Sequence, residues 1–107
     1  MSLTAKDLWT ADGKNRRPYD KYPEWTEAVA KSEGIAFMDF INIMGEKFDT
    51  MGREKVHALY PRDTTHTNEA GADLNAAGVV AGLKAMNSPL VKYLSEKGKA
   101  VPAYSKD

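Results

Sequence analysis

The sequence lacks cysteine entirely among its 107 residues. This absence excludes disulfide bonds, thiolate metal sites and a cysteine nucleophile. Neither positive nor negative charge is in excess, since Lys+Arg and Asp+Glu each number 15. A surface of balanced charge gives no reason to expect nucleic acid or an anionic membrane as a partner.

Long apolar runs are also absent. No run approaches the roughly 20 residues that a helix needs to cross a bilayer, and from its polar first residues we expect no signal peptide in this sequence. A length of 107 residues with 42% hydrophobic and 28% charged side chains is typical of one small globular domain. We therefore expect no membrane partner and a single domain.

Turn-forming residues divide the chain into a polar segment and a series of helices. Residues 1–21 are polar, and Asp12-Gly13 and Arg17-Pro18 favour turn and extended backbone there. In the following helix, Trp25 and Val29 recur at helical spacing and should face a core. Proline and glycine positions predict helices at about 23–32, 41–50, 53–60 and 89–95, the last ending at Gly98.

A short apolar run, Ile35–Met38, follows the glycine that should cap the first helix, Gly34. A continuous apolar run of this length predicts a parallel strand buried on both faces, with Asp39 at its carboxyl end. One strand cannot make a sheet, because the backbone groups of a buried strand need partners. Part of the packing surface is therefore expected from another copy of the chain or from a longer native protein.

Residues 70–86 form the most apolar part of the chain, with Asp73, Asn75 and Lys84 as the only polar side chains. A helix that is apolar almost all round is typically buried, and Asn68 can cap its N-terminus. Its glycines fall close to one face and favour close packing. An apolar surface of this size argues against a well-behaved monomer and leaves the oligomeric state open, with a homo-oligomer as one way to cover it.

The chemically distinctive feature is Asp63-Thr64-Thr65-His66, which lies in a loop without apolar side chains, residues 62–68. An aspartate and a histidine at this spacing can fold back on each other. The carboxylate then holds the Nδ1–H of the imidazole and leaves Nε2 as a base. The alternative is that Asp63 and Thr64 cap a turn while His66 faces solvent.

The run from Asp63 to Ala72 (DTTHTNEAGA), with its trailing apolar helix, resembles the last motif of SGNH (GDSL-type) hydrolases. It is most similar to the rhamnogalacturonan acetylesterase group, whose pattern is D-x-T-H-(F/T)-(N/S)-x-x-G-A. Upstream segments extend the resemblance to about residues 14–86; they are Arg16–Tyr19, Tyr22–Glu24, Val29–Asp39 and Gly52–Val56.

This resemblance implies an α/β fold class, namely the C-terminal fragment of a three-layer α/β/α SGNH (flavodoxin-like) fold, mostly helical with one short parallel strand. Residues 1–107 would be a single partial domain, with a polar loop segment at 1–21 and the hydrolase part at 22–107. Asp63 would be the triad acid and His66 the triad base of a serine esterase. Its full-length parent, secreted or periplasmic and bacterial, would act on acetylated polysaccharide or oligosaccharide without a metal or organic cofactor.

The chain departs from the family where the nucleophile should be. It contains neither the G-D-S motif that carries the serine nor the G-x-N-D block that completes the oxyanion hole. Its serines, at positions 2, 32, 88, 95 and 105, stand in no nucleophile context. Because loss of triad members lowers turnover by orders of magnitude, we expect no ester hydrolysis by this chain alone.

Three other hypotheses about the function of these residues stay open. Arg16 and Arg17 could bind an anionic sugar such as galacturonate, or could form a solvated basic turn. His57, Asp63 and His66 could hold zinc with two imidazoles and one carboxylate. The whole chain could instead be a non-catalytic helical module that oligomerises through residues 70–86.

Overall fold

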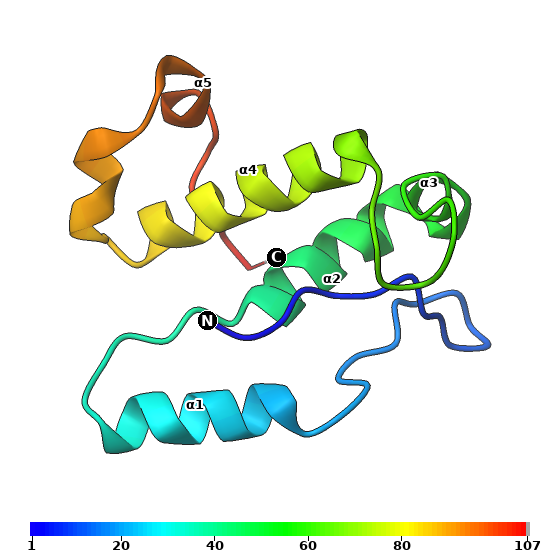
Figure 1. The fold of residues 1–107 in the computed structure, drawn as a ribbon, viewed down its shortest axis with the longest axis horizontal. Helices are drawn as coiled ribbons and strands as arrows, with labels where there is room; N and C mark the ends of the chain where they lie inside the picture. The colour runs from blue at the N-terminus through cyan, green and yellow to red at the C-terminus, as the bar shows by residue number, and fades with distance from the viewer. Residues whose placement is uncertain (107) are drawn as a thin grey trace.

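Helices dominate the computed structural model, which describes residues 1–106 (Figure 1). No strand forms within that part of the chain apart from an isolated bridge between Trp9 and Asn15. The expectation of a mostly helical chain is confirmed. The elements are α1 (Tyr22–Ser32), α2 (Phe40–Met51), α3 (Arg53–His57), α4 (Glu69–Ala85), the 3-10 helix η1 (Pro89–Tyr93) and α5 (Glu96–Lys99).

The expected helix boundaries hold to within a residue or two for α1 and α2. Gly52 separates α2 from α3 with φ of 86°, a left-handed conformation that glycine adopts without strain. Within the helix expected at 89–95, only Pro89–Tyr93 is helical and it forms a 3-10 helix, and Gly98 lies inside α5 rather than ending a helix. Asp107, the last residue of the expected 22–107 segment, lies outside the described residues.

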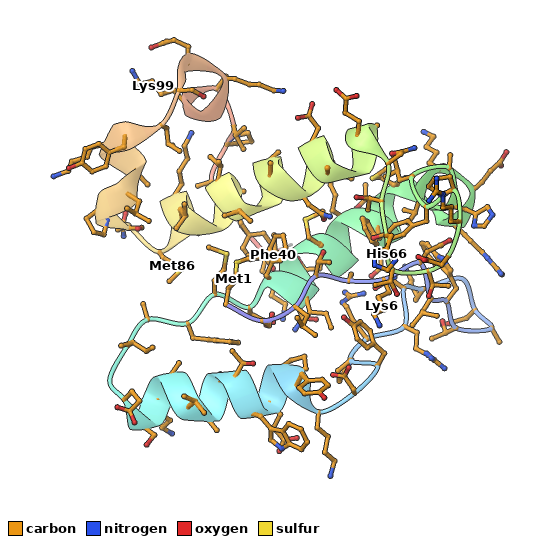
Figure 2. All side chains as sticks on the ribbon, viewed as in Figure 1. Met1, Lys6, Phe40, His66, Met86 and Lys99 are labelled. Atoms are coloured by element: carbon orange, nitrogen blue, oxygen red, sulfur yellow. The ribbon has the colours of Figure 1, made fainter. Side chains whose placement is uncertain are left out.

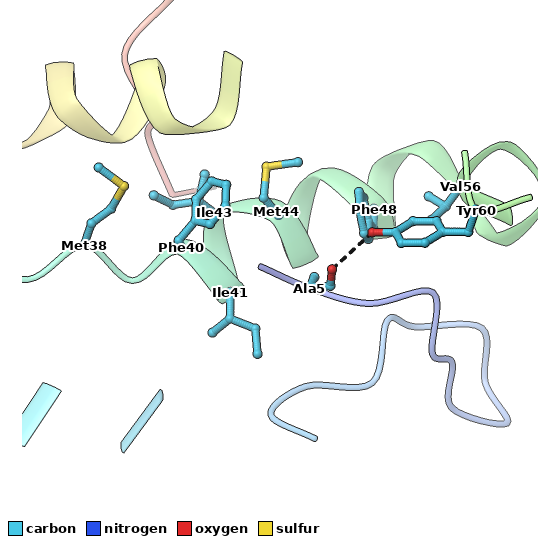
Figure 3. Packing of buried hydrophobic residues seen from close by; sticks show 9 residues of the cluster. All are labelled: Ala5, Met38, Phe40, Ile41, Ile43, Met44, Phe48, Val56 and Tyr60. Carbon is cyan, nitrogen blue, oxygen red and sulfur yellow. Dashed lines mark hydrogen bonds between the residues drawn. The ribbon is translucent and has the colours of Figure 1, made fainter. Parts of the chain in front are cut away.

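Helix α2 forms the centre of the hydrophobic core. Its buried side chains face α4 on one side and the N-terminal segment on the other (Figures 1 and 3). Phe48 meets the ring of Tyr60 edge to face, with 6.2 Å between the ring centroids. The core consists of Ala5, Met38, Phe40, Ile41, Ile43, Met44, Phe48, Val56 and Tyr60.

The glycines of α4 allow this helix to approach the core closely. A Cβ at Gly82 would lie 2.6 Å from Sδ of Met38, and one at Gly78 would overlap Sδ of Met44. The expected close approach therefore exists, but methionines fill the space instead of a sheet. Only Gly71 and Gly82 of α4 are fully buried, so this helix is more exposed than its composition predicts.

The expected strand at Ile35–Met38 is wrong: residues 35–39 form neither a strand nor a helix. A backbone hydrogen bond from Ser2 N–H to the Met38 carbonyl, at 3.0 Å, joins this segment to the N-terminal residues. Ile35 is 62% exposed. The apolar run is suited to burial in a sheet, but residues 1–106 contain no strand that could pair with it.

Helix α1 buries only Ala30, so the prediction that Trp25 and Val29 face a core is also wrong. Trp25 and Val29 are 56% and 59% exposed, and Trp25 contacts Tyr22 edge to face at 5.4 Å between centroids. We name the exposed residues Tyr22, Trp25, Val29 and Ile35 the α1 apolar face. Among the residues described, no helix has the length and apolar character to cross a membrane.

Candidate functional site

The loop after α3 carries the Asp-x-x-His motif and occupies one end of the molecule. Tyr60 is buried and anchors the start of this loop in the core, while residues 61–66 are exposed. At the other end of the loop, Asn68 caps α4 by accepting a hydrogen bond from Gly71 N–H at 3.0 Å. Buried Tyr60 and the cap residue Asn68 therefore hold the two ends of the loop in place. His66 lies at this end of the molecule, close to the N-terminal segment that includes Lys6 (Figure 2).

Asp63 and His66 form a hydrogen-bonded pair. Oδ2 of Asp63 lies 2.8 Å from Nδ1 of His66, and Oδ1 of Asp63 accepts the backbone N–H groups of Thr65 and His66, each at 2.7 Å. Neutral His66 therefore donates from Nδ1, which leaves the lone pair of Nε2 available. The side chains are 46% and 80% exposed, so the pair is open to solvent.

Electrostatics keep Asp63 ionised. The hydrogen bond from the His66 backbone N–H, the one from its side chain and the Thr65 N–H lower the pKa of Asp63 from 3.8 to about 2. Asp63 thus caps a turn with one oxygen and orients His66 with the other. Asp63 therefore both caps the turn and pairs with His66, so the two local arrangements that the sequence left open occur together. The catalytic roles of Asp63 and His66 stay predictions.

No serine completes this pair within residues 1–106. The hydroxyl of Ser2 is buried and accepts the Ile41 N–H at 2.9 Å, and the hydroxyls of Ser88 and Ser95 cap η1 and α5. No hydrogen bond joins a serine hydroxyl to His66 in this part of the chain. A cavity of about 600 Å³, lined by Met44, Leu74, Tyr104 and their neighbours, lies between α2, α4 and the C-terminal tail and includes neither Asp63 nor His66.

The two arginines proposed for substrate binding lie in different environments. Arg16 is exposed. Arg17 is half-buried, where Nη1 meets Oδ2 of Asp49 at 3.0 Å and Nε donates to Oδ1 of Asn42 at 3.0 Å. Because the guanidinium of Arg17 is held against α2, Arg16 is the more accessible of the two for a ligand.

The structure brings together a second Asp–His pair that sequence reasoning missed. Nδ1 of His57 lies 2.7 Å from Oδ2 of Asp7. The two residues are 50 positions apart in the chain, so no local motif could have indicated the pair. His57, Asp63 and His66 form no metal-ligating group, since no cluster of three or more such side chains exists in the described part of the chain.

Comparison with known proteins supports the resemblance drawn from the residues. No family model matches the chain. The chain is similar to a rhamnogalacturonan acetylesterase of Emericella nidulans, with 27% identity over 95 residues that cover 85% of this chain and 38% of that protein. The chain thus spans well under half the length of this relative. A similarity over 85% of the chain includes the 63–72 segment, which lies well inside both ends.

Proposed function

We propose that this chain is the C-terminal part of a carbohydrate acetylesterase of the SGNH type and supplies the Asp63–His66 half of a Ser-His-Asp triad. The observation that carries the proposal is the 2.8 Å contact between Oδ2 of Asp63 and Nδ1 of His66. The distant similarity to a rhamnogalacturonan acetylesterase supports the same reading. On this proposal the mostly helical chain is one portion of a three-layer α/β/α domain, and residues 35–39 pair with strands outside it.

The reaction would be acyl transfer through a serine ester. Nε2 of His66 takes the proton of a serine hydroxyl, supplied by the rest of the whole protein, as the serine oxygen attacks the acetyl carbonyl. His66 then returns the proton to the sugar oxygen that leaves. In the second step, His66 takes a proton from water as the water oxygen attacks the acetyl carbonyl, and returns that proton to the serine oxygen as acetate leaves. Asp63 holds the Nδ1–H throughout and stabilises the imidazolium.

The proposed substrate is an acetylated polysaccharide or oligosaccharide. Arg16 is exposed and offers a planar guanidinium that could form a bidentate contact with the carboxylate of a galacturonate unit. The proposed mechanism requires no metal or organic cofactor.

A chimera tests the proposal. This chain replaces the matching part of the Emericella nidulans enzyme, and acetate release from acetylated rhamnogalacturonan is measured together with p-nitrophenyl acetate hydrolysis. A folded chimera should hydrolyse both esters. His66→Ala should lower the rate by at least about a thousandfold, whereas Lys55→Ala, an exposed change on α3, should leave it unchanged.

The chain alone serves as the second arm of this experiment. We expect no hydrolysis of p-nitrophenyl acetate above the buffer rate by the free chain, because its serines do not reach His66. A folded chimera without esterase activity, or equal rates before and after His66→Ala, would refute the proposal.

The α1 apolar face favours a second candidate, a non-catalytic helical module that forms homo-oligomers. Trp25 and Val29 are more than half exposed there, and apolar clusters of this kind mark interfaces. This face, rather than residues 70–86, would be the interface. Sedimentation equilibrium of the free chain separates the candidates: a dimer dissociated by Trp25→Glu but not by the exposed control change Glu24→Gln favours this one.

A further inference from the structure

The carboxylate of Asp7 links the N-terminal segment to α3. Its side chain is only 5% exposed, and both of its oxygens are used. Oδ1 accepts from the indole Nε1–H of Trp9 at 2.6 Å, and Oδ2 lies 2.7 Å from Nδ1 of His57. Two residues earlier, the carbonyl of Ala5 accepts from the hydroxyl of Tyr60 at 3.2 Å. A buried carboxylate is costly unless both oxygens have donors, so these contacts fix residues 5–9 against α3.

The main chain of Asp7 continues this connection into the loop of the candidate site. The N–H of Asp7 donates to the carbonyl of Thr64 at 3.0 Å. Thr64 lies between Asp63 and His66 in the sequence. One residue therefore holds α3 through its side chain and the Asp63–His66 loop through its backbone.

Between its two ends, which Tyr60 and Asn68 hold in place, the loop is joined to the rest of the molecule at one further point. The hydrogen bonds of Asp63 to Thr65 and His66 all lie within the loop. For residues 61–67, the bond from Asp7 is the one hydrogen bond that reaches a distant part of the described chain. An exposed loop held at one internal point depends on that point for its order.

We propose that Asp7 is a positioning residue for the Asp63–His66 pair, and that His57 secures Asp7 in place. The proposal rests on the proposed function, since the pair it positions is the triad half named there. The imidazole of His57 donates from Nδ1 to Asp7 and braces its buried carboxylate. The backbone of Asp7 then holds Thr64, which sets where the imidazole of His66 stands and in which direction its Nε2 points.

The experiment uses nuclear magnetic resonance on the free chain, with ring-¹⁵N-labelled histidine. The chain has two histidines, so the two imidazole spectra are assigned with one His66→Gln variant. The nitrogen shifts give the tautomer of each ring, and hydrogen exchange of the Thr65 and His66 amides reports loop order. The variants are Asp7→Asn and a matched control, Asp12→Asn, which is exposed in the same segment and contacts the Thr10 hydroxyl.

In the unaltered chain both rings should be Nδ1–H tautomers. In Asp7→Asn, the new side-chain NH₂ would face Nδ1 of His57 and force that ring into its Nε2–H tautomer. Loss of the hydrogen bond between Asp7 and His57 should turn His66 into a mixture of tautomers. It should also speed the hydrogen exchange of the Thr65 and His66 amides by about tenfold or more. Asp12→Asn should change neither ring nor the exchange rates.

Two results would overturn the proposal. One is an Asp7→Asn chain that is folded, with His57 switched but with the tautomer and amide exchange of His66 unchanged. The other applies if Asp7→Asn does not fold: His57→Ala then decides, because His57 is 76% exposed and its removal opens no cavity in the core. No change at His66 in His57→Ala contradicts the proposal, and a change in the same direction supports it.

This test is independent of ester hydrolysis. An inactive chimera alongside a clear effect of Asp7 on His66 would refute the esterase function and leave the positioning contact standing. An active chimera alongside an unaffected His66 would refute only the role of Asp7.

Discussion

The side chain of Arg17 lies across α2 directly over Gly45. Its Cδ and Nε atoms occupy the place where a Cβ at residue 45 would stand. From there Nη1 reaches Asp49, at 3.0 Å, and Nε reaches Asn42. The absence of a side chain at Gly45 therefore lets the half-buried guanidinium join the polar segment at 1–21 to the helix at the centre of the core.

Gly45→Ala should destabilise the fold even though alanine is the better helix former. Propensity alone predicts a gain of about 1 kcal/mol. The clash with the Arg17 stem should reverse the sign and lower the free energy of unfolding by about 1–3 kcal/mol. Urea denaturation measures this change. In an Arg17→Ala background the stem is absent, so the same substitution should be neutral or stabilising. A gain of stability in the unaltered background would contradict this packing.

Asn68 joins the candidate loop to α4, and its replacement by alanine should cost about 1–2 kcal/mol of unfolding free energy. Oδ1 of Asn68 caps the Gly71 N–H at 3.0 Å, and Nδ2 donates to the Ala58 carbonyl at 3.1 Å. Asn68→Asp keeps the cap and loses only the donor to Ala58, so thermal melts should show a smaller loss for this variant. Equal losses for both variants would mean that the cap contributes little.

Acid should remove the stabilisation that Asp63 provides. The pKa of Asp63 is lowered in the folded chain from 3.8 to about 2, so the ionised form is favoured by folding. This contribution is fully present above about pH 4 and is lost as the pH falls through about 2. The difference in unfolding free energy between the unaltered chain and Asp63→Asn should therefore narrow across that window. A difference that stays constant from pH 5 to pH 2 would argue against the hydrogen bonds to Asp63.

Local signals in the sequence predicted the elements that depend on neighbouring residues. Asn68 caps α4, Gly52 ends α2, and Asp63 meets His66 three positions on. Signals of this kind are carried by a few adjacent residues, so one sequence suffices to find them.

Features that depend on a distant partner could not be predicted in the same way. Periodicity identified the apolar side of Trp25 and the apolar run at Ile35–Met38, but an apolar pattern does not say whether a partner lies within the same chain. The Asp7–His57 and Arg17–Asp49 pairs join residues that only the fold brings together. Their side chains have no distinctive spacing in the sequence.

Tyr60 and Tyr104 should titrate late, at about pH 12. The chain has five tyrosines, and removal from solvent is the main cause that raises the pKa of both Tyr60 and Tyr104 from 10.0 to about 12. Because folding favours the neutral phenols, their contribution to stability is intact below about pH 10 and is lost as the pH rises towards 12. Phenolate absorbance should therefore show a separate late phase.

Glu46 distinguishes the two late phenols. The hydroxyl of Tyr104 donates to Oε2 of Glu46 at 2.6 Å, and both the hydrogen bond and the negative charge of Glu46 raise the pKa of Tyr104. Glu46→Gln removes that charge, so Tyr104 should titrate at a lower pH, while Tyr60, which donates to the Ala5 carbonyl, should not move. Tyr60→Phe and Tyr104→Phe assign the two phenols in the absorbance titration. If Glu46→Gln left both late phenols unchanged, Glu46 could not be the partner that holds the C-terminal tail against α2.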